Sequence, residues 1–217
     1  WGIQELREAC SAYYERRFGF PLKNVMITSG VSGGLFLGLM ATIGPGDEVI
    51  CADPYFVMYK HLVNLLGGTS VPVDTYPDFK LTADRIAGAI TPRTKALIVS
   101  SPANPTGVMM NAEELQAVAA LARKHNLLVI SDEIYESLSY DGTPASIAGM
   151  YDNVLCLNGF SKNAAMTGWR VGFAAGPDEI IQAMNTLQQY TFVCAPSFAQ
   201  KAAVLALEAD MTAKVDA

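Results

Sequence analysis

The feature that most constrains the fold is a series of short apolar runs that alternate with helical patterns. The run Thr94–Ser101 (TKALIVSS) is apolar almost throughout. A strand that is apolar on both faces is typical of a parallel sheet covered by helices on both sides. Strand-like runs are also found at Val25–Thr28, Glu48–Cys51, Thr69–Val73, Leu127–Ser131, Asn153–Asn158 and Arg170–Gly176.

Segments with apolar residues at helical spacing separate these strands. Helices are expected near residues 3–13, 33–43, 55–66, 82–90, 111–125 and 177–190, and another from about 204 to the last residue. The regular alternation of strand and helix predicts an α/β fold, with a mostly parallel central sheet and helices on both faces. The length of 217 residues suits one such domain, residues 1–217.

Composition narrows the possible partners and the compartment. The net charge is −6, whereas nucleic acid and anionic membranes require a basic face, so we expect neither as a partner. The longest apolar run, residues 33–43, is too short to span a bilayer, and the first residues lack the pattern of a signal peptide. The four cysteines lie far apart and only two histidines are present, so we expect buried free thiols, no metal site and a reducing cytoplasm.

Glycines follow the first predicted strand directly and begin an apolar helix. Gly30, Gly33 and Gly34 would let an anion approach the backbone at the helix N-terminus. Free amide groups and the helix dipole both favour negative charge at such a place. An ordinary tight turn between a strand and a helix has the same pattern, so both interpretations stay open.

A lysine in an unusual place follows the strand Asn153–Asn158. Lys162 comes just after an apolar run, next to Ser161, and Arg170 follows eight residues later. Lysines are among the residues least often buried, so one at the end of a buried strand indicates a specific role for its amine.

Side chains of different chemical types follow the predicted strands. In open α/β sheets, ligands bind beyond the carboxyl ends of the strands. Those ends carry a possible anion cradle, an aromatic pair, an amide, a carboxylate with a phenol, and an amine: Gly30–Gly34, Tyr55 and Phe56, Asn104, Asp132 and Tyr135, and Ser161 and Lys162. A ligand that uses this whole set is a phosphorylated, aromatic, electron-poor aldehyde, namely pyridoxal 5′-phosphate (PLP).

The chain resembles the class I/II aminotransferases, the aspartate aminotransferase relatives among the fold type I PLP enzymes. Three motifs carry the resemblance: SPANPTG (Ser101–Gly107), SDEIY (Ser131–Tyr135) and FSKNAAMTGWRVG (Phe160–Gly172). The resemblance implies that residues 1–217 form the PLP-binding large domain. An N-terminal segment and a C-terminal small domain, which carries the arginine for the substrate α-carboxylate, are expected outside this chain.

The resemblance also implies catalytic roles. Lys162 would be the Schiff-base lysine and the base that moves a proton, which a desolvated site near other cations promotes. Asp132 would pair with the pyridine nitrogen and keep it protonated, although an aspartate there is also typical of a helix N-cap. Tyr135 and Asn104 would bind the 3′-oxygen, and the Asn104–Pro105 bond would be cis; Asn104 also suits an ordinary turn.

The phosphate would be bound by two side chains and a backbone cradle. Arg170 offers a planar fork that matches phosphate oxygens, and Ser161 adds a hydroxyl group. The amides around Val31, Ser32 and Gly33 would complete the cradle.

An aromatic ring is expected to stack on the pyridine face. Phe56 is preferred because the aromatic of the family follows the proline by two residues, and Tyr55 is the alternative. Either ring also suits a place in the core.

The resulting hypothesis is a PLP-dependent aminotransferase that acts on an amino acid and a 2-oxo acid, with the homodimeric assembly of the family. A carbon–sulfur β-lyase or an aminocyclopropane carboxylate synthase-like enzyme would use the same cofactor residues. A non-catalytic alternative is a PLP-binding fragment without turnover, or the sensor domain of a transcription regulator. The groups that determine substrate specificity are expected mostly outside this chain.

Overall fold

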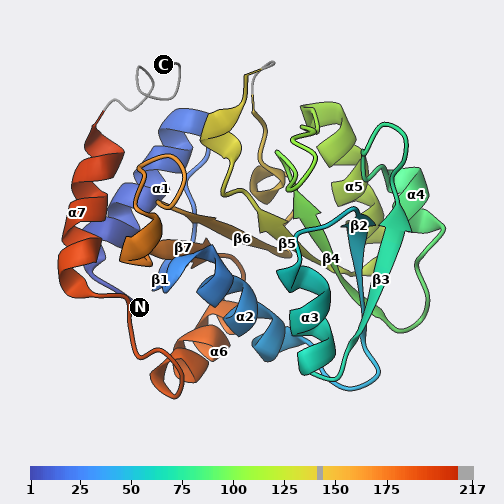
Figure 1. Ribbon diagram of the computed structural model, residues 1–217, viewed down its shortest axis with the longest axis horizontal. Helices are drawn as coiled ribbons and strands as arrows, with labels where there is room; N and C mark the ends of the chain where they lie inside the picture. The colour runs from blue at the N-terminus through green and yellow to red at the C-terminus, as the bar shows by residue number, and fades with distance from the viewer. Residues whose placement is uncertain (141–143, 210–217) are drawn as a thin grey trace.

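The apolar runs form one seven-stranded sheet in the computed structural model, which describes residues 1–140 and 144–209 (Figure 1). The strand order is β1-β7-β6-β5-β4-β2-β3. The strands are β1 (Met26–Thr28), β2 (Glu48–Asp53), β3 (Thr69–Asp74), β4 (Thr94–Ser100), β5 (Leu128–Asp132), β6 (Val154–Gly159) and β7 (Gly172–Ala175). The predicted α/β fold is confirmed.

One strand runs against the others. Strands β2 to β6 are mutually parallel, whereas β7 is antiparallel to both of its neighbours, β6 and β1. The carboxyl ends of β1 to β6 and the amino end of β7 therefore lie at the same edge of the sheet. Residues 160–171, which connect β6 to β7, stay at that edge, so Lys162 and Arg170 share one connection.

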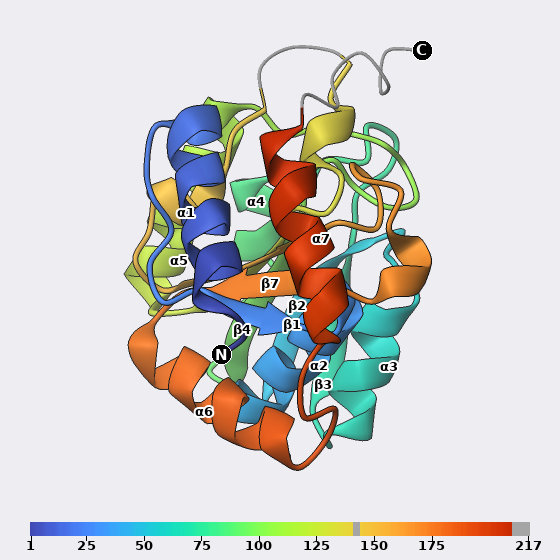
Figure 2. The same ribbon diagram turned by 90° about the vertical axis from the view of Figure 1, so that its left-hand side faces the viewer.

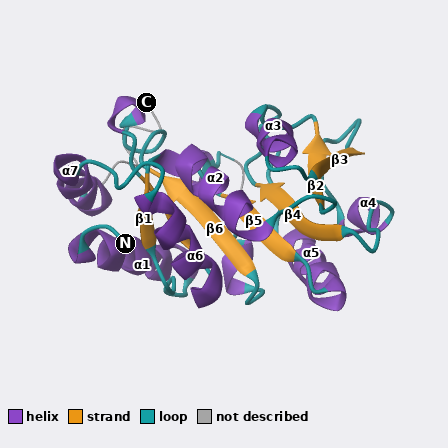
Figure 3. Ribbon diagram, turned by 90° about the horizontal axis from the view of Figure 1, so that it is seen from below, coloured by secondary structure: helices purple, strands orange, loops and turns teal. Residues whose placement is uncertain are grey.

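Helices cover both faces of the sheet. The α-helices are α1 (Gln4–Phe18), α2 (Gly30–Thr42), α3 (Met58–Leu65), α4 (Ala83–Ala87), α5 (Ala112–His125), α6 (Asp178–Gln189) and α7 (Ser197–Glu208). Helices α2, α3 and α6 pack on one face, and α1, α7, α4 and α5 pack on the other. Figure 2 shows α1 and α7 side by side, and Figure 3 shows α3 and α5 on opposite sides of the strands. No described helix has the length and apolar character that a membrane span requires.

Sequence chemistry explains several helix boundaries. Helix α2 is apolar nearly all round and is accordingly buried against the sheet. Helix α5 begins with a capping box, in which the Asn111 side chain accepts from the Glu114 amide and the Glu114 side chain accepts from the Asn111 amide. Helix α4 is shorter than the expected range 82–90, because Thr82 is its N-cap and Gly88 follows its last residue.

Some predicted boundaries are wrong. Tyr55 and Phe56 do not begin a helix: they lie between β2 and α3, after Pro54, which lacks an amide hydrogen and ends the strand. Arg170 lies outside β7 because its backbone is left-handed, with φ 52°. Asp132 is the last residue of β5, where it is paired with Leu157, rather than the first residue beyond it.

The ends of two other helices also differ from expectation. Helix α2 begins at Gly30 rather than near residue 33, which brings its first turn next to β7. Helix α7 ends at Glu208, and the remainder of the helix expected to reach the last residue falls on residues 210–217, outside the described residues.

Glycines allow the loop edge of β7 to touch the first turn of α2. A Cβ atom on Gly172 would lie 2.7 Å from the Gly30 carbonyl carbon and 2.8 Å from the Val31 amide nitrogen. Both contacts are to backbone atoms, which cannot rotate away as a side chain can. The approach of β7 to α2 therefore requires a residue without a side chain.

We predict that Gly172→Ala lowers the free energy of unfolding by about 1–3 kcal/mol, as expected for overpacking. Gly168→Ala is the matched control, because a Cβ atom there would meet nothing within 4 Å. Urea unfolding monitored by circular dichroism measures both. Equal stability of the two variants would contradict the close approach of β7 and α2.

Candidate active site

The predicted site residues converge on the edge of the sheet where the parallel strands end. Asp132 is contributed by the end of β5, Asn104 by the loop after β4, and Lys162 and Arg170 by the connection from β6 to β7. The first turn of α2 follows β1 at the same edge. Strand direction alone thus brings together side chains that lie far apart in the sequence.

Asp132 is a buried carboxylate with fixed partners. It is 4% exposed. Its Oδ2 accepts a hydrogen bond from the Tyr59 hydroxyl at 2.8 Å, and its Oδ1 accepts from the Ile134 amide at 3.3 Å. Burial raises the pKa of Asp132, and these two hydrogen bonds oppose the rise. Asp132 is not a helix N-cap. The next helical turn is the 3₁₀ helix Glu136–Leu138, and its N-cap is Tyr135.

An amide, a phenol and an amine lie in a row at the same edge of the sheet. The Asn104 Nδ2 donates to the Tyr135 hydroxyl at 3.4 Å. The Lys162 Nζ lies 5.4 Å from the centre of the Tyr135 ring. The Asn104–Pro105 peptide bond is cis, as the resemblance implied. Asn104, Tyr135 and Lys162, which are expected to contact the same side of the ligand, are therefore neighbours.

The first turn of α2 faces a guanidinium group. Gly30 has φ +71°, and a Cβ atom there would lie 2.5 Å from Arg170 Nη2, so glycine makes room for the arginine. Arg170 Nη1 donates to the Thr167 carbonyl at 2.9 Å, and Thr167 Oγ1 donates to the Ser161 carbonyl at 2.8 Å. These bonds hold the residue 160–171 loop so that Arg170 and the helix N-terminus lie together, which is an arrangement suited to a phosphate.

The backbone amides of the predicted cradle belong to this same turn. Val31 and Ser32 are half-buried and Gly33 is buried. Ser29, the residue before the helix, makes no capping side-chain bond within the described structure. The amide groups of the first turn have no intrahelical acceptor and are available to a ligand.

Lys162 is not desolvated in this chain. Its side chain is exposed, as is that of Arg170. The expectation that the Lys162 amine lies in a desolvated site is therefore wrong for the described residues, 1–140 and 144–209. The physical reason is its position on a loop at the edge of the sheet, beyond the last pairs of β6.

The two candidate aromatic residues both lie near Tyr59 but touch different groups. The Phe56 ring packs edge-on against Tyr59, with 5.7 Å between ring centres, and Tyr59 holds Asp132. Tyr55 instead lines a small cavity together with Asn104 and Tyr59. Both rings are half-buried and pack against the main core cluster.

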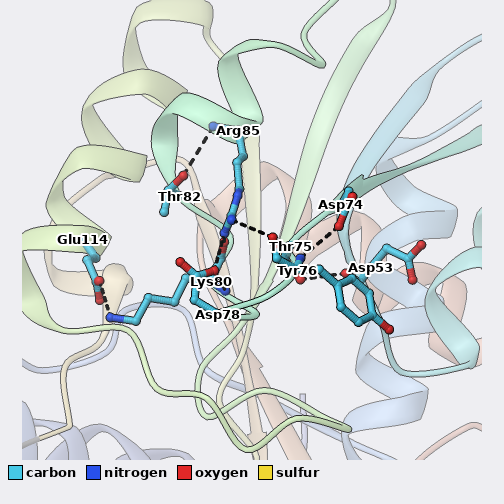
Figure 4. A network of polar contacts seen from close by, with 9 residues as sticks. All are labelled: Asp53, Asp74, Thr75, Tyr76, Asp78, Lys80, Thr82, Arg85 and Glu114. Carbon is cyan, nitrogen blue, oxygen red and sulfur yellow. Dashed lines mark hydrogen bonds and ion pairs between the residues drawn. The ribbon is translucent and has the colours of Figure 1, made fainter.

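The far wall of that cavity is a loop fixed by ion pairs (Figure 4). Arg85 Nη1 donates to Asp78 Oδ1 at 2.5 Å and to the Lys80 carbonyl at 2.6 Å, and its Nη2 donates to the Tyr76 carbonyl. The Lys80 amine pairs with Glu114 of α5 at 2.6 Å. The loop between β3 and α4 is thereby held against the site, with Phe79 facing the cavity.

Sequence reasoning missed two contributors to the site. Tyr59 was not among the predicted site residues, and its hydrogen bond to Asp132 spans 73 residues. Thr167, which orients Arg170 through its carbonyl, was not among them either. One expected trait also fails: Cys10, Cys51 and Cys156 are buried free thiols, but Cys194 is exposed. Within the described residues, no cluster of metal-ligating side chains is found.

Comparison with known proteins defines the class. Residues 1–216 match the family model of aminotransferase class I and II. The chain therefore belongs to the class I and II aminotransferase family.

Individual relatives are similar over nearly the whole chain. An aspartate/prephenate aminotransferase of Cereibacter sphaeroides is 44% identical over 216 residues, which are 95% of this chain and 54% of that relative. An aspartate aminotransferase of Pyrococcus abyssi is 41% identical over 215 residues, 95% of this chain and 55% of its own length. A tetra mutant of Thermus thermophilus aspartate aminotransferase superposes with a TM-score of 0.95 at 41% identity, covering 99% of this chain and 61% of that one. The chain thus spans about half the length of the curated relatives.

We predict that Tyr59→Phe destabilises the fold by about 1–3 kcal/mol when Asp132 is ionised, because a buried carboxylate loses a donor. The folded state raises the pKa of Asp132, so the free energy of unfolding falls as the pH rises through its titration, and more steeply in the variant. At acidic pH, where Asp132 is protonated, the difference shrinks.

Urea unfolding at acidic and mildly alkaline pH measures this effect. Tyr190→Phe is the control, because Tyr190 is 83% exposed. A loss for Tyr59→Phe that is independent of pH would contradict the coupling to Asp132.

Proposed function

We propose that the protein is a PLP-dependent aminotransferase that moves an amino group between an amino acid and a 2-oxo acid. Residues 1–217 would form its PLP-binding large domain. The observation that carries the proposal is the row formed by Asn104, Tyr135 and Lys162, at the edge of the sheet where β5 ends in the buried Asp132. Together these residues offer the amine, phenol, amide and carboxylate that the substituents of a pyridoxal ring would use.

The residues fit PLP at its phosphate end. Gly30 leaves the space that Arg170 fills, and the first turn of α2 presents its amides beside that guanidinium group. Arg170 and Ser161 would bind the phosphate, with the amides around Val31, Ser32 and Gly33. A fixed arginine fork and helix amides together favour a dianionic group.

The other residues would orient the ring and move the proton. When bound, PLP supplies an electron sink that stabilises negative charge on the substrate α-carbon. Asp132 would hold a proton on the pyridine nitrogen, because its burial strengthens that charge–charge contact. Asn104 and Tyr135 would donate to the 3′-oxygen, and Phe56, or alternatively Tyr55, would cover one ring face. Lys162 would bind the aldehyde and carry the proton as general base.

A homodimer in the cytoplasm is proposed as the working form. Three exposed apolar side chains lie on one side of the molecule: Trp169, Phe198 and Leu205, at 43%, 69% and 66% exposure. Phe198 and Leu205 are seven residues apart on α7, and Phe198 lies 6.1 Å from the Trp169 ring. Exposed apolar side chains grouped in this way are typical of interfaces. The free cysteines suit a reducing compartment.

We predict that the chain turns yellow with PLP and that borohydride then fixes the cofactor covalently. Lys162→Ala should abolish the fixed adduct, because it removes the amine that lies next to Tyr135. Lys124→Ala, which removes an exposed lysine of α5, is the matched control and should retain it. An undiminished adduct in the Lys162→Ala variant would contradict the assignment.

Amino acids then distinguish the enzyme classes. Loss of the yellow absorbance on addition of an amino acid, and its return with a 2-oxo acid, is expected for an aminotransferase. Release of pyruvate and ammonia from cystathionine without an oxo acid would instead indicate a β-lyase. Absence of any spectral change with every amino acid would indicate a fragment without turnover.

We predict that the chain sediments as a dimer and that Phe198→Asp shifts it to the monomer, because a charge in a desolvated contact is costly. Leu65→Asp is the control: Leu65 is 72% exposed and lies on α3, away from α7. Analytical ultracentrifugation measures both, and a dimer that survives Phe198→Asp would place the interface elsewhere.

A further inference from the structure

The segment Asp132–Glu136 presents acidic residues to two different sides of the molecule. Asp132 and Tyr135 contact Tyr59 and Asn104 at the candidate active site. Glu133 and Glu136 instead bind α1, which packs on the opposite face of the sheet. The cofactor-side residues and the α1-side residues therefore alternate along one short segment.

Glu133 is buried, and its carboxylate accepts hydrogen bonds from three hydroxyl groups. The residue is 3% exposed. Its Oε1 accepts from Ser131 Oγ and Ser146 Oγ, both at 2.8 Å, and its Oε2 accepts from the Tyr14 hydroxyl at 2.9 Å. Its backbone amide donates to the Leu157 carbonyl at 2.9 Å, which ties the end of β5 to β6.

Tyr14 extends this contact to the strand that leads to Lys162. The Tyr14 hydroxyl accepts a hydrogen bond from Asn158 Nδ2 at 3.0 Å and lies 3.3 Å from Cys156 Sγ. Asn158 Oδ1 in turn accepts from the Gly159 amide at 2.7 Å, at the last residue of β6. A continuous chain of hydrogen bonds thus runs from Glu133 through Tyr14 to the start of the loop that carries Lys162.

Such a network is costly if its only role is to fill the core. A buried carboxyl group without a cationic partner must be stabilised by hydrogen bonds alone, and apolar residues of similar volume are often at least as stabilising. Glu136, the neighbouring acid, does have a cation, because Arg17 Nε lies 3.3 Å from its Oε2 and Tyr13 donates to its other oxygen. Glu133, in contrast to Glu136, has no cationic partner among the described residues.

We propose that Glu133 is a positioning residue for the cofactor. Through Tyr14 and Asn158 it would hold the ends of β5 and β6 in a fixed relation, so that Asp132 and Lys162 reach one bound PLP molecule. This inference rests on the proposed function, because it needs PLP to bind at the carboxyl ends of those two strands. The residue does not itself touch the ligand.

Binding of PLP to the 217-residue chain tests the proposal. The visible absorbance gives the dissociation constant for the unmodified chain and for Glu133→Gln and Tyr14→Phe, beside their thermal unfolding. Both variants should raise the dissociation constant about fivefold or more, which corresponds to the loss of one hydrogen bond. Glu48→Gln is the matched control. Glu48 is also buried and is bound by Thr91 and Arg93, but it is the first residue of β2, at the edge of the sheet opposite to the candidate site.

A purely structural role predicts a different pattern. Glu48→Gln should lower the unfolding temperature without changing PLP affinity. If Glu133→Gln and Tyr14→Phe do the same, the positioning role is overturned. If Glu133→Gln does not fold, Tyr14→Phe decides alone, because it leaves the carboxyl group with both serines. If the unmodified chain binds no PLP, the proposed function has failed, and that result is visible before any variant is compared.

A pH profile adds a second readout. Burial raises the pKa of Glu133 to about 7, while its hydrogen bonds to Ser131, Ser146 and Tyr14 lower it and Glu136 raises it. The folded state thus binds this proton more tightly than the unfolded chain, and the free energy of unfolding falls as the pH rises from the ordinary glutamate value, about 4.3, towards 7. Glu133→Gln should reduce that slope to the part contributed by Asp132 and Glu136, whose pKa values burial also raises, and Tyr14→Phe should extend it to higher pH. An unchanged slope in both variants would show that Glu133 does not titrate in this range.

Discussion

The backbone contact between the start of β7 and the first turn of α2 is the constraint on which the site depends. Because β7 runs against β6, its amino end arrives at the edge where the parallel strands end. Gly172 and Gly30 let that end approach within backbone contact distance, and Arg170 is thereby placed over the helix N-terminus. The same connection carries Lys162, so one short loop supplies both the proposed phosphate-binding arginine and the proposed Schiff-base lysine.

The sheet edge combines a buried acidic side chain with two exposed cationic side chains. Asp132 is buried, and its charge depends on Tyr59 and on the Ile134 amide. Lys162 and Arg170 are exposed in this chain and free to bind a ligand. A buried acid and exposed cations at one edge of the sheet are suited to a ligand that bridges them, with its ring nitrogen at the acid and its phosphate at the arginine. The chain belongs to the class I and II aminotransferase family, which is consistent with this arrangement.

Much of this could be predicted from the sequence, since local patterns determine it. Apolar runs such as Thr94–Ser101 revealed the parallel strands, and their carboxyl ends indicated Asn104, Asp132 and Lys162 as neighbours. The long-range hydrogen bonds around those residues could not be predicted: Tyr59 donates to Asp132 from 73 residues away, and Tyr14 and Glu133 are 119 residues apart and meet through the packing of α1 on the sheet. The left-handed backbone of Arg170 was missed for a related reason, because tertiary contacts with Gly30 override the strand-like pattern around it.

The central claim is that one lysine at the end of β6 anchors the cofactor. Mass spectrometric mapping of the chain after treatment with PLP and borohydride tests it most directly. The account predicts a single modified peptide that contains Lys162, at one PLP per chain. Modification spread over the exposed lysines, or centred on a lysine other than Lys162, would contradict it.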